Sequence, residues 1–159
     1  MVNYLKQNYP RNSMSKKKII SMTSLSALAT IMVVTLSPYF YDVEVDEALP
    51  TAFAALPEGK FVGVGDGIHD VQGDAQILEF GDDTKYLRLE NFKSTNGPDL
   101  YVYLSTDEKA SDFVSLGSLK GNIGNQNYEI PEGVDLSKYN KVLIWCKSFS
   151  VLFGSAELE

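Results

Sequence analysis

Cys146 is the single cysteine of this 159-residue chain and stands in the most apolar stretch of its C-terminal half, Val142–Cys146. A lone cysteine cannot close a disulfide within the chain. Outside the cytoplasm, a free thiol must be buried, paired with another chain, bound to a ligand or used in redox chemistry. On a strand, Cys146 shares one face with Val142 and Ile144, whereas Trp145 lies on the other face. We therefore expect Cys146 to point toward the core beside Ile144.

His69 is the only histidine and lies in an acidic, glycine-containing stretch. Two interpretations are open: a solvated or hydrogen-bonded loop residue, or a ligand of a metal or haem or a base near the Cys146 thiol. A closed zinc site with one histidine and one cysteine would also need carboxylates, and no spacing suggests them. The four-residue spacings of Asp66, Asp70 and Asp74 do not fit an EF-type calcium loop. We therefore predict no metal site.

Other polar and aromatic residues each have a structural interpretation beside a functional one. Arg88 alternates with leucines, so we expect a surface residue paired with an acidic neighbour. Asp99 is expected to cap a turn or the start of a strand. Four aromatic residues either pack at the edge of a small sandwich or form a surface for a sugar or a protein: Tyr101, Tyr103, Tyr128 and Trp145. No nucleophile elbow, phosphate loop, dinucleotide fingerprint or catalytic triad is present, so no motif points to a turnover enzyme.

The formal net charge of −7 is distributed unevenly along the chain. Five basic and no acidic residues precede Asp42, whereas nine basic and twenty-one acidic residues follow from that position, a net charge of −12. An acidic domain of this kind repels nucleic acid, so a nucleic-acid-binding function is excluded.

The uncharged run from Ile19 to Leu36 follows three lysines and ends before Ser37-Pro38. This length is short but sufficient for a spanning helix, and aromatic residues follow it where the membrane interface would fall. The basic flank favours a cytoplasmic N-terminus and a domain outside the cell membrane. The run is either an uncleaved signal anchor or a cleaved signal peptide, in which case the protein is secreted, and an ordinary buried helix is the third interpretation.

The chain therefore divides into a basic cytoplasmic N-terminus (1–18), a signal anchor or signal peptide (19–41), an acidic linker (42–57) and one domain (58–159). The domain shows short alternating apolar runs separated by turn residues rather than a helical period. We predict an all-β fold, an antiparallel sandwich or barrel of about eight strands. The expected strands cover residues 59–65, 75–80, 85–90, 100–104, 113–119, 126–130, 141–147 and 151–156. The pair on either side of Gly81-Asp82-Asp83 is the clearest hairpin.

A series of short motifs, in one order from about Pro57 to Leu158, resembles the DM-thirteen domain, an electron-transfer domain also found in Skeletor-type proteins. The matching residues are Gly59-Lys60-Phe61, His69, Gly73-Asp74-Ala75, Leu87-Arg88-Leu89, Phe92, Asn96-Gly97-Pro98-Asp99-Leu100, Val102-Tyr103-Leu104-Ser105, Leu116-Gly117, Leu119-Lys120-Gly121, Gly124-Asn125-Gln126, Tyr128, Pro131, Val142, Ile144-Trp145-Cys146, Phe149, Phe153-Gly154 and Ala156. The resemblance implies that Cys146 acts in redox chemistry, either as a bare thiol or by holding a prosthetic group such as haem.

The leading hypothesis is an extracytoplasmic redox or electron-transfer module centred on Cys146. In this hypothesis His69 is a second ligand, Trp145 and Phe149 shape the pocket, and the redox partner is a separate protein. The alternative is a cell-surface binding or adhesion module in which Cys146 is buried and inert and exposed tyrosines and acidic loops meet a protein or glycan. A homodimer linked through Cys146 is a third hypothesis.

Overall fold

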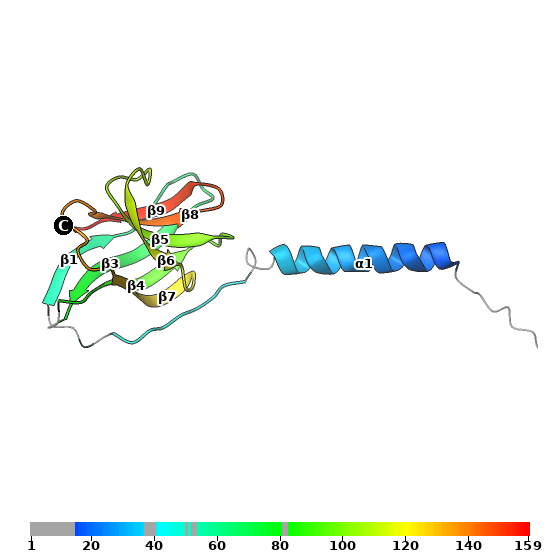
Figure 1. Cartoon of the computed structure of the whole chain (residues 1–159), viewed down its shortest axis with the longest axis horizontal. Coiled ribbons are helices and arrows are strands. Elements are labelled where there is room, and N and C mark those ends of the chain that lie inside the picture. Colours follow the sequence, from blue (N-terminus) through cyan, green and yellow to red (C-terminus); the bar gives the residue numbers. More distant parts are fainter. Residues whose placement is uncertain (1–14, 37–40, 50, 52–53, 81–82) are drawn as a thin grey trace, which may run out of the picture. The chain divides into compact units, whose positions relative to one another are not determined.

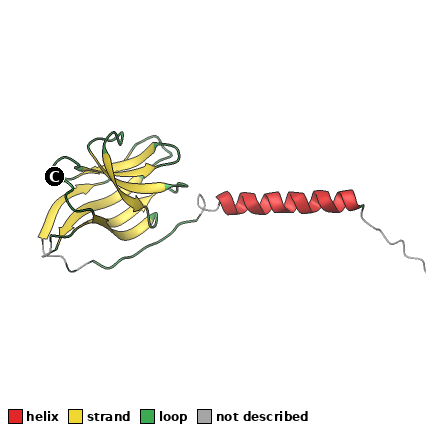
Figure 2. Ribbon diagram, viewed as in Figure 1, coloured by secondary structure: helices red, strands yellow, loops and turns green. Residues whose placement is uncertain are grey.

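The computed structural model describes residues 15–36, 41–49, 51, 54–80 and 83–159 of the chain. The chain forms two compact units, divided between Ser37 and Pro38, and each is described by itself. Among these residues, the first unit contains one helix and the second contains the strands (Figures 1 and 2).

The helix of the first unit, α1 (Lys16–Leu36), covers the uncharged run in which the sequence predicts a helix. It contains no glycine or proline, the two residues that most disfavour a helix interior. Leu25, Leu28 and Ile31 are exposed. No helix among the described residues is long and apolar enough to cross a membrane. The helix itself is thus confirmed, while its role as an anchor or signal stays a prediction.

The second unit is an antiparallel β-sandwich, as predicted, and its described residues form nine strands rather than about eight. One sheet has the order β1-β3-β4-β7, with β1 (Ala54–Lys60), β3 (Val71–Glu79), β4 (Lys85–Ser94) and β7 (Ile123–Ile130). The other has the order β2-β9-β8-β5-β6, with β2 (Val62–Gly63), β9 (Val151–Glu157), β8 (Lys141–Cys146), β5 (Leu100–Ser105) and β6 (Phe113–Ser118).

Alternating apolar side chains from both sheets fill the core between them. The inward residues of β5 and β8 are Leu100, Val102, Leu104, Val142, Ile144 and Cys146. They meet side chains of the four-stranded sheet, among them Ala75, Ile77, Leu87, Leu89 and Tyr128. The hairpin predicted around residues 81–83 is confirmed by the pairing of β3 with β4 down to Glu79 and Lys85. Two of its turn residues, Gly81 and Asp82, lie outside the described residues.

The single strand predicted from Gly59 to Gly65 is wrong, because the chain changes sheets at Phe61. β1 ends at Lys60 and pairs with β3, whereas β2 pairs with β9. Phe61 is buried, and its ring lies edge-on to that of Phe92 with centroids 5.5 Å apart. β1 also begins at Ala54, so the last residues of the segment predicted as a linker form a strand.

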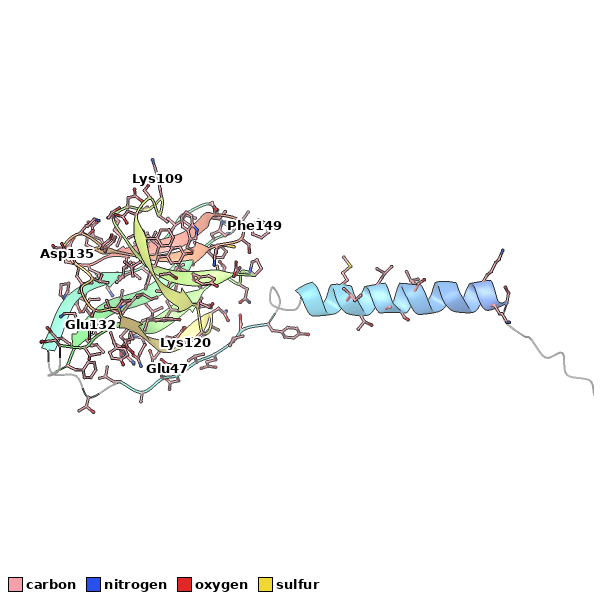
Figure 3. The ribbon with its side chains drawn as sticks, viewed as in Figure 1. Glu47, Lys109, Lys120, Glu132, Asp135 and Phe149 are labelled. Carbon is pink, nitrogen blue, oxygen red and sulfur yellow. The ribbon has the colours of Figure 1, made fainter. Side chains whose placement is uncertain are left out.

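Four connections gather at one end of the sandwich, which we call the Cys146 end. They join β2 to β3 (64–70), β4 to β5 (95–99), β6 to β7 (119–122) and β8 to β9 (147–150). Figure 3 shows Phe149 at this end and Glu132 and Asp135 at the other. His69, Phe149 and the last residue of β8, Cys146, therefore lie at the same end of the fold.

Candidate functional site at the Cys146 end

Cys146 is the last residue of β8 and is only 1% exposed. It pairs with Leu100 on β5 and with Val151 on β9, and its side chain belongs to the hydrophobic core. The thiol is free. The structure therefore places Cys146 where strand alternation predicts it, facing inward on the same side of β8 as Ile144.

His69 lies in the connection between β2 and β3, where Asp66 fixes its ring. The Nδ1 atom is 2.6 Å from Asp66 Oδ2, while Asp66 Oδ1 accepts the backbone N–H groups of Ile68 at 2.8 Å and His69 at 2.7 Å. Hydrogen bonds from the His69 backbone, the His69 ring and the Ile68 backbone lower the pKa of Asp66 to about 2. A carboxylate on one ring nitrogen is the usual support of a histidine whose other nitrogen binds a ligand, so Nε2 is the atom left for that role.

Phe153, Gly97 and Leu100 lie in series between His69 and Cys146. The His69 ring packs on Phe153, with centroids 4.4 Å apart. Phe153 and Leu100 both pack against Gly97, where a Cβ atom would come within 2.9 Å of Phe153 and 2.8 Å of Leu100. Leu100 in turn is the cross-strand neighbour of Cys146. The structure brings His69 and Cys146 to one end of the sandwich, and no bond joins them among the described contacts.

Asp99 fastens the turn that follows Cys146. Its carbonyl accepts the backbone N–H of Lys147 at 3.0 Å, and its carboxylate accepts the Ser148 hydroxyl at 2.6 Å. The β2–β3 connection (64–70) and the β4–β5 connection (95–99) are also joined, by a hydrogen bond of 2.9 Å from the Thr95 N–H to the carbonyl of Asp70. The capping role expected for Asp99 is thus a link between two loops.

Trp145 and Phe149 do not join Cys146 in a pocket. Trp145 points to the opposite face of its sheet, where its cross-strand neighbour is Tyr101. Phe149 lies in the turn between β8 and β9 and is 66% exposed. Of the four residues selected from the sequence, Cys146 lies in the core and His69 packs on the core residue Phe153.

The outer face of the five-stranded sheet has its own aromatic cluster. Tyr103 stacks on Phe113, with ring centroids 4.2 Å apart, and Tyr101 lies 6.1 Å from Tyr103. The Nζ of Lys147 is 4.8 Å from the centroid of the Tyr101 ring. Tyr103 and Tyr128 are each only 3% exposed, so the expectation of exposed tyrosines is wrong for these two.

Arg88 pairs with an acidic neighbour, Glu90, at 3.4 Å as expected, but it is 3% exposed, so the expected surface position is wrong. Residues 42–48 cover it: its Nη1 donates to the carbonyl of Glu47 at 3.3 Å and to the side chain of Asn127 at 3.0 Å. Nothing in the local pattern of β4 shows that a segment forty residues earlier lies over it.

Four clefts on the described part of the domain have no lining contributed by Cys146. One of about 240 Å³ opens at the Cys146 end and is lined by residues such as Gly97, Asp99 and Leu100. Neither Cys146 nor His69 lines this cleft or the other three. Within the described residues, no group of three histidine, cysteine, aspartate or glutamate side chains is placed to hold a metal ion.

The fold and site define a small β-sandwich domain with a buried thiol and an oriented histidine at one end. A family model described as electron transfer DM13 matches residues 61–158. The chain belongs to this DM13 family, as the resemblance of its motifs predicts, and the family supports a general electron-transfer role. No curated protein and no solved structure matches the chain. Both α1 and residues 42–48 lie outside the matched region.

Proposed function

We propose that this protein is an extracytoplasmic electron-transfer module whose redox centre is Cys146. The observation that supports it best is the DM13 match together with the position of Cys146 at a strand end, where His69 and three further loops gather. His69 serves as an oriented polar group at that end, and a separate protein exchanges electrons with the domain.

The bare thiol fits the structure better than a haem ligand does. A haem iron bound by Cys146 needs space beside Sγ, but the residue is 1% exposed and lines no cleft described above. The nearby cleft of about 240 Å³ is also below the range of about 300–1,000 Å³ of small-molecule and cofactor pockets. Reaction of the thiol therefore requires an opening. The turn 147–150, held by Asp99, follows Cys146 directly and is the segment we propose to move.

The location outside the cytoplasm is supported by the sequence around α1. Three lysines begin the helix, and every acidic residue of the chain follows it. This asymmetry favours a cytoplasmic N-terminus and export of the acidic domain.

Thiol reactivity of the full-length protein tests the proposed redox centre. We expect Cys146 to react with a disulfide reagent in the native state and Cys146→Ser to abolish the reaction while the circular dichroism spectrum is retained. A matched control is Val142→Cys in the Cys146→Ser background, because Val142 is equally buried on the same face of β8. Equal, denaturation-dependent reactivity of the two thiols would show that Cys146 is an ordinary core residue.

An absorption spectrum of the same proteins, produced in a bacterial periplasm with haem available, tests the form of the centre. We expect no Soret band. A Soret band that disappears in Cys146→Ser would show that Cys146 is a haem ligand rather than a bare thiol.

The burial of Cys146 favours one second candidate, a surface-binding module with an inert cysteine. Its contact surface would be the outer aromatic face, where Phe113 is 43% exposed beside Tyr103 and Tyr101. In that case Phe113→Ala would abolish partner binding, and Cys146→Ser would change only stability, by about 1 kcal/mol.

A further inference from the structure

Exposed apolar side chains gather at the Cys146 end of the sandwich. Within the region that matches the family, the described residues include five exposed large apolar side chains: Val62, Val64, Ile68, Phe113 and Phe149. All but Phe113 belong to β2, to the β2–β3 connection or to the β8–β9 turn. Ile68 is 72% exposed and Phe149 is 66% exposed, and Figure 3 shows Phe149 at this end. Exposed apolar residues that cluster on neighbouring loops are typical of a contact surface.

Hydrogen bonds join the loops that carry these residues. The Val64 N–H donates to the carbonyl of Phe153 on β9 at 3.4 Å. The β2–β3 connection is bonded to the β4–β5 connection at Asp70, and the β4–β5 connection is bonded to the β8–β9 turn at Asp99. The three loops therefore form one continuous surface at the end where Cys146 closes β8.

Aspartates flank the apolar residues of this surface. The three loops carry three aspartates and one lysine: Asp66, Asp70, Asp99 and Lys147. Hydrogen bonds lower the pKa of Asp66 to about 2, so this carboxylate is charged at neutral pH. The Nζ of Lys147 lies over the Tyr101 ring, on the outer face of the five-stranded sheet. The apolar surface thus has a negatively charged rim.

Residues 42–48, which we call the acidic strap, add a further carboxylate to this rim. The strap lies along the free edge of β7, where the Val45 and Glu47 N–H groups each donate to a β7 carbonyl at 2.9 Å. At the start of the strap, the Asp42 carboxylate accepts the side-chain amide of Asn96 at 3.2 Å. Because Asn96 belongs to the β4–β5 connection, docking of the strap brings Asp42 to the Cys146 end.

The cleft at the same end offers a place for a cationic side chain. It has a volume of about 240 Å³, with Tyr41 and Pro98 among its walls and Asp99 beside them. Lys120 also lines it but is paired with Glu47 at 2.7 Å. A lysine or arginine of another protein can place its methylene groups along such walls and keep its charge beside a carboxylate.

An apolar centre with an acidic rim is complementary to a protein whose own contact surface has an apolar centre and a basic rim. The apolar centre supplies contact area, and opposite charges at the rim align the two proteins and speed their encounter. A lipid surface is less suitable, since the phosphates of its head groups would meet the aspartates. Redox partners use small contact areas, below about 1,200 Å², which the loops at one end of a domain can provide.

We propose that the Cys146 end is the docking face for the redox partner, a protein with a basic rim around an apolar centre. Ile68 and Phe149 form the apolar contact, and the aspartates of the rim meet the cations of the partner. Docking there places the partner against the β8–β9 turn, the segment proposed above to open. This inference rests on the proposed electron-transfer function and adds the docking side and the chemistry of the partner.

Binding of a small basic c-type cytochrome to the full-length protein tests this face. The Cys146→Ser background excludes thiol chemistry from the measurement. We expect saturable binding at low ionic strength that salt weakens, and no binding of an acidic ferredoxin. Ile68→Lys and Phe149→Ser should each raise the Kd about tenfold, because one places a cation among the aspartates and the other removes an apolar contact.

Two matched variants separate this face from the rest of the surface. Glu132→Gln, at the opposite end, raises the net charge by one unit, as Ile68→Lys does. Phe113→Ser removes the other exposed phenylalanine of the described residues, which lies on the outer aromatic face. Both variants should leave the Kd within about twofold of its starting value.

Equal losses of binding within either matched pair, or no binding of the cytochrome, would overturn the proposal. Association with phosphatidylcholine vesicles that Phe149→Ser reduces, without cytochrome binding, would assign the face to a lipid surface instead. The thiol-reactivity test of the proposed function is separate from this one. If that test fails while docking persists in Cys146→Ser, the face is a protein contact and Cys146 is not the redox centre.

Discussion

Gly117 and Gly124 both adopt positive φ angles, +117° and +102°, but only one of them faces another segment. A Cβ atom on Gly124 would overlap the carbonyl of Val45, whereas one on Gly117 would meet nothing within 4 Å. The same substitution at the two sites therefore separates the cost of backbone strain from the cost of displacing the strap.

We predict that Gly117→Ala lowers the free energy of unfolding by about 1–3 kcal/mol through backbone strain alone. Gly124→Ala should lose about 2 kcal/mol more, because the displaced strap gives up the backbone hydrogen bonds of Val45 and Glu47, each worth about 1 kcal/mol. Urea unfolding measures the difference, and hydrogen exchange at the two amides reports the strap directly. Equal losses at the two glycines would show that the strap adds no stability.

Single residues differ in how far their environment follows from the sequence. Alternation along β8 correctly predicts that Cys146 faces the core and Trp145 the opposite side. The orientation of His69 could also have been found, since Asp66 stands three residues earlier and binds the ring within one loop. The burial of Arg88 could not, because it depends on Glu47, which lies forty-one positions away in the chain.

At the scale of elements, strands with a clear alternation and local turns were predicted well. β3 and β4 form the expected hairpin, and β5, β8 and β9 cover the expected ranges closely. The sequence predicted one strand from Gly59 to Gly65 and missed its division into β1 and β2. Phe61, where the chain changes sheets, is buried and apolar like a residue inside a strand, so no turn residue marks the break. The strap was missed because its contacts are made by backbone groups and carboxylates, which leave no apolar period.

The strap also depends on charge. Partial burial tends to raise the pKa of Glu47, but hydrogen bonds from the Lys120 ammonium and the Asn127 backbone outweigh it, so this pKa is held below its ordinary value. The docked strap therefore favours the ionised carboxylate. The stability that the ionised Glu47 carboxylate gives to the docked strap is fully present above the ordinary carboxyl pKa and is lost as the pH falls through the lowered pKa.

We predict that hydrogen-exchange protection of the Glu47 and Val45 amides, corrected for intrinsic rates, is constant above the ordinary carboxyl pKa of 4.5 and falls as the pH drops below it. Glu47→Gln should remove most of this pH dependence. Glu132→Gln, at an exposed position at the far end of the sandwich, is the charge-matched control and should leave it intact. An unchanged pH profile in Glu47→Gln would mean that another carboxylate, such as Asp42 or Asp46, controls docking.

At the scale of the whole molecule, the proposed location outside the cytoplasm rests on the uneven distribution of charge along the chain. The basic residues of the N-terminal region and the acidic domain follow from the sequence alone. A location outside the cytoplasm gives the single thiol an oxidising environment, in which a buried cysteine is protected until an opening exposes it. In the proposed function, the location of the domain determines which redox partners can reach Cys146.

We predict that the domain is exported and the N-terminus retained. Two forms in the Cys146→Ser background report the two sides: Lys109→Cys in the exposed connection between β5 and β6, and Lys6→Cys in the basic N-terminal region. A membrane-impermeant maleimide added to intact cells should label Lys109→Cys and reach Lys6→Cys only after lysis. Loss of residues 1–18 from the mature protein would indicate a cleaved signal peptide and a secreted domain. If neither cysteine is labelled before lysis, the domain lies inside, and the proposed extracytoplasmic redox role is wrong.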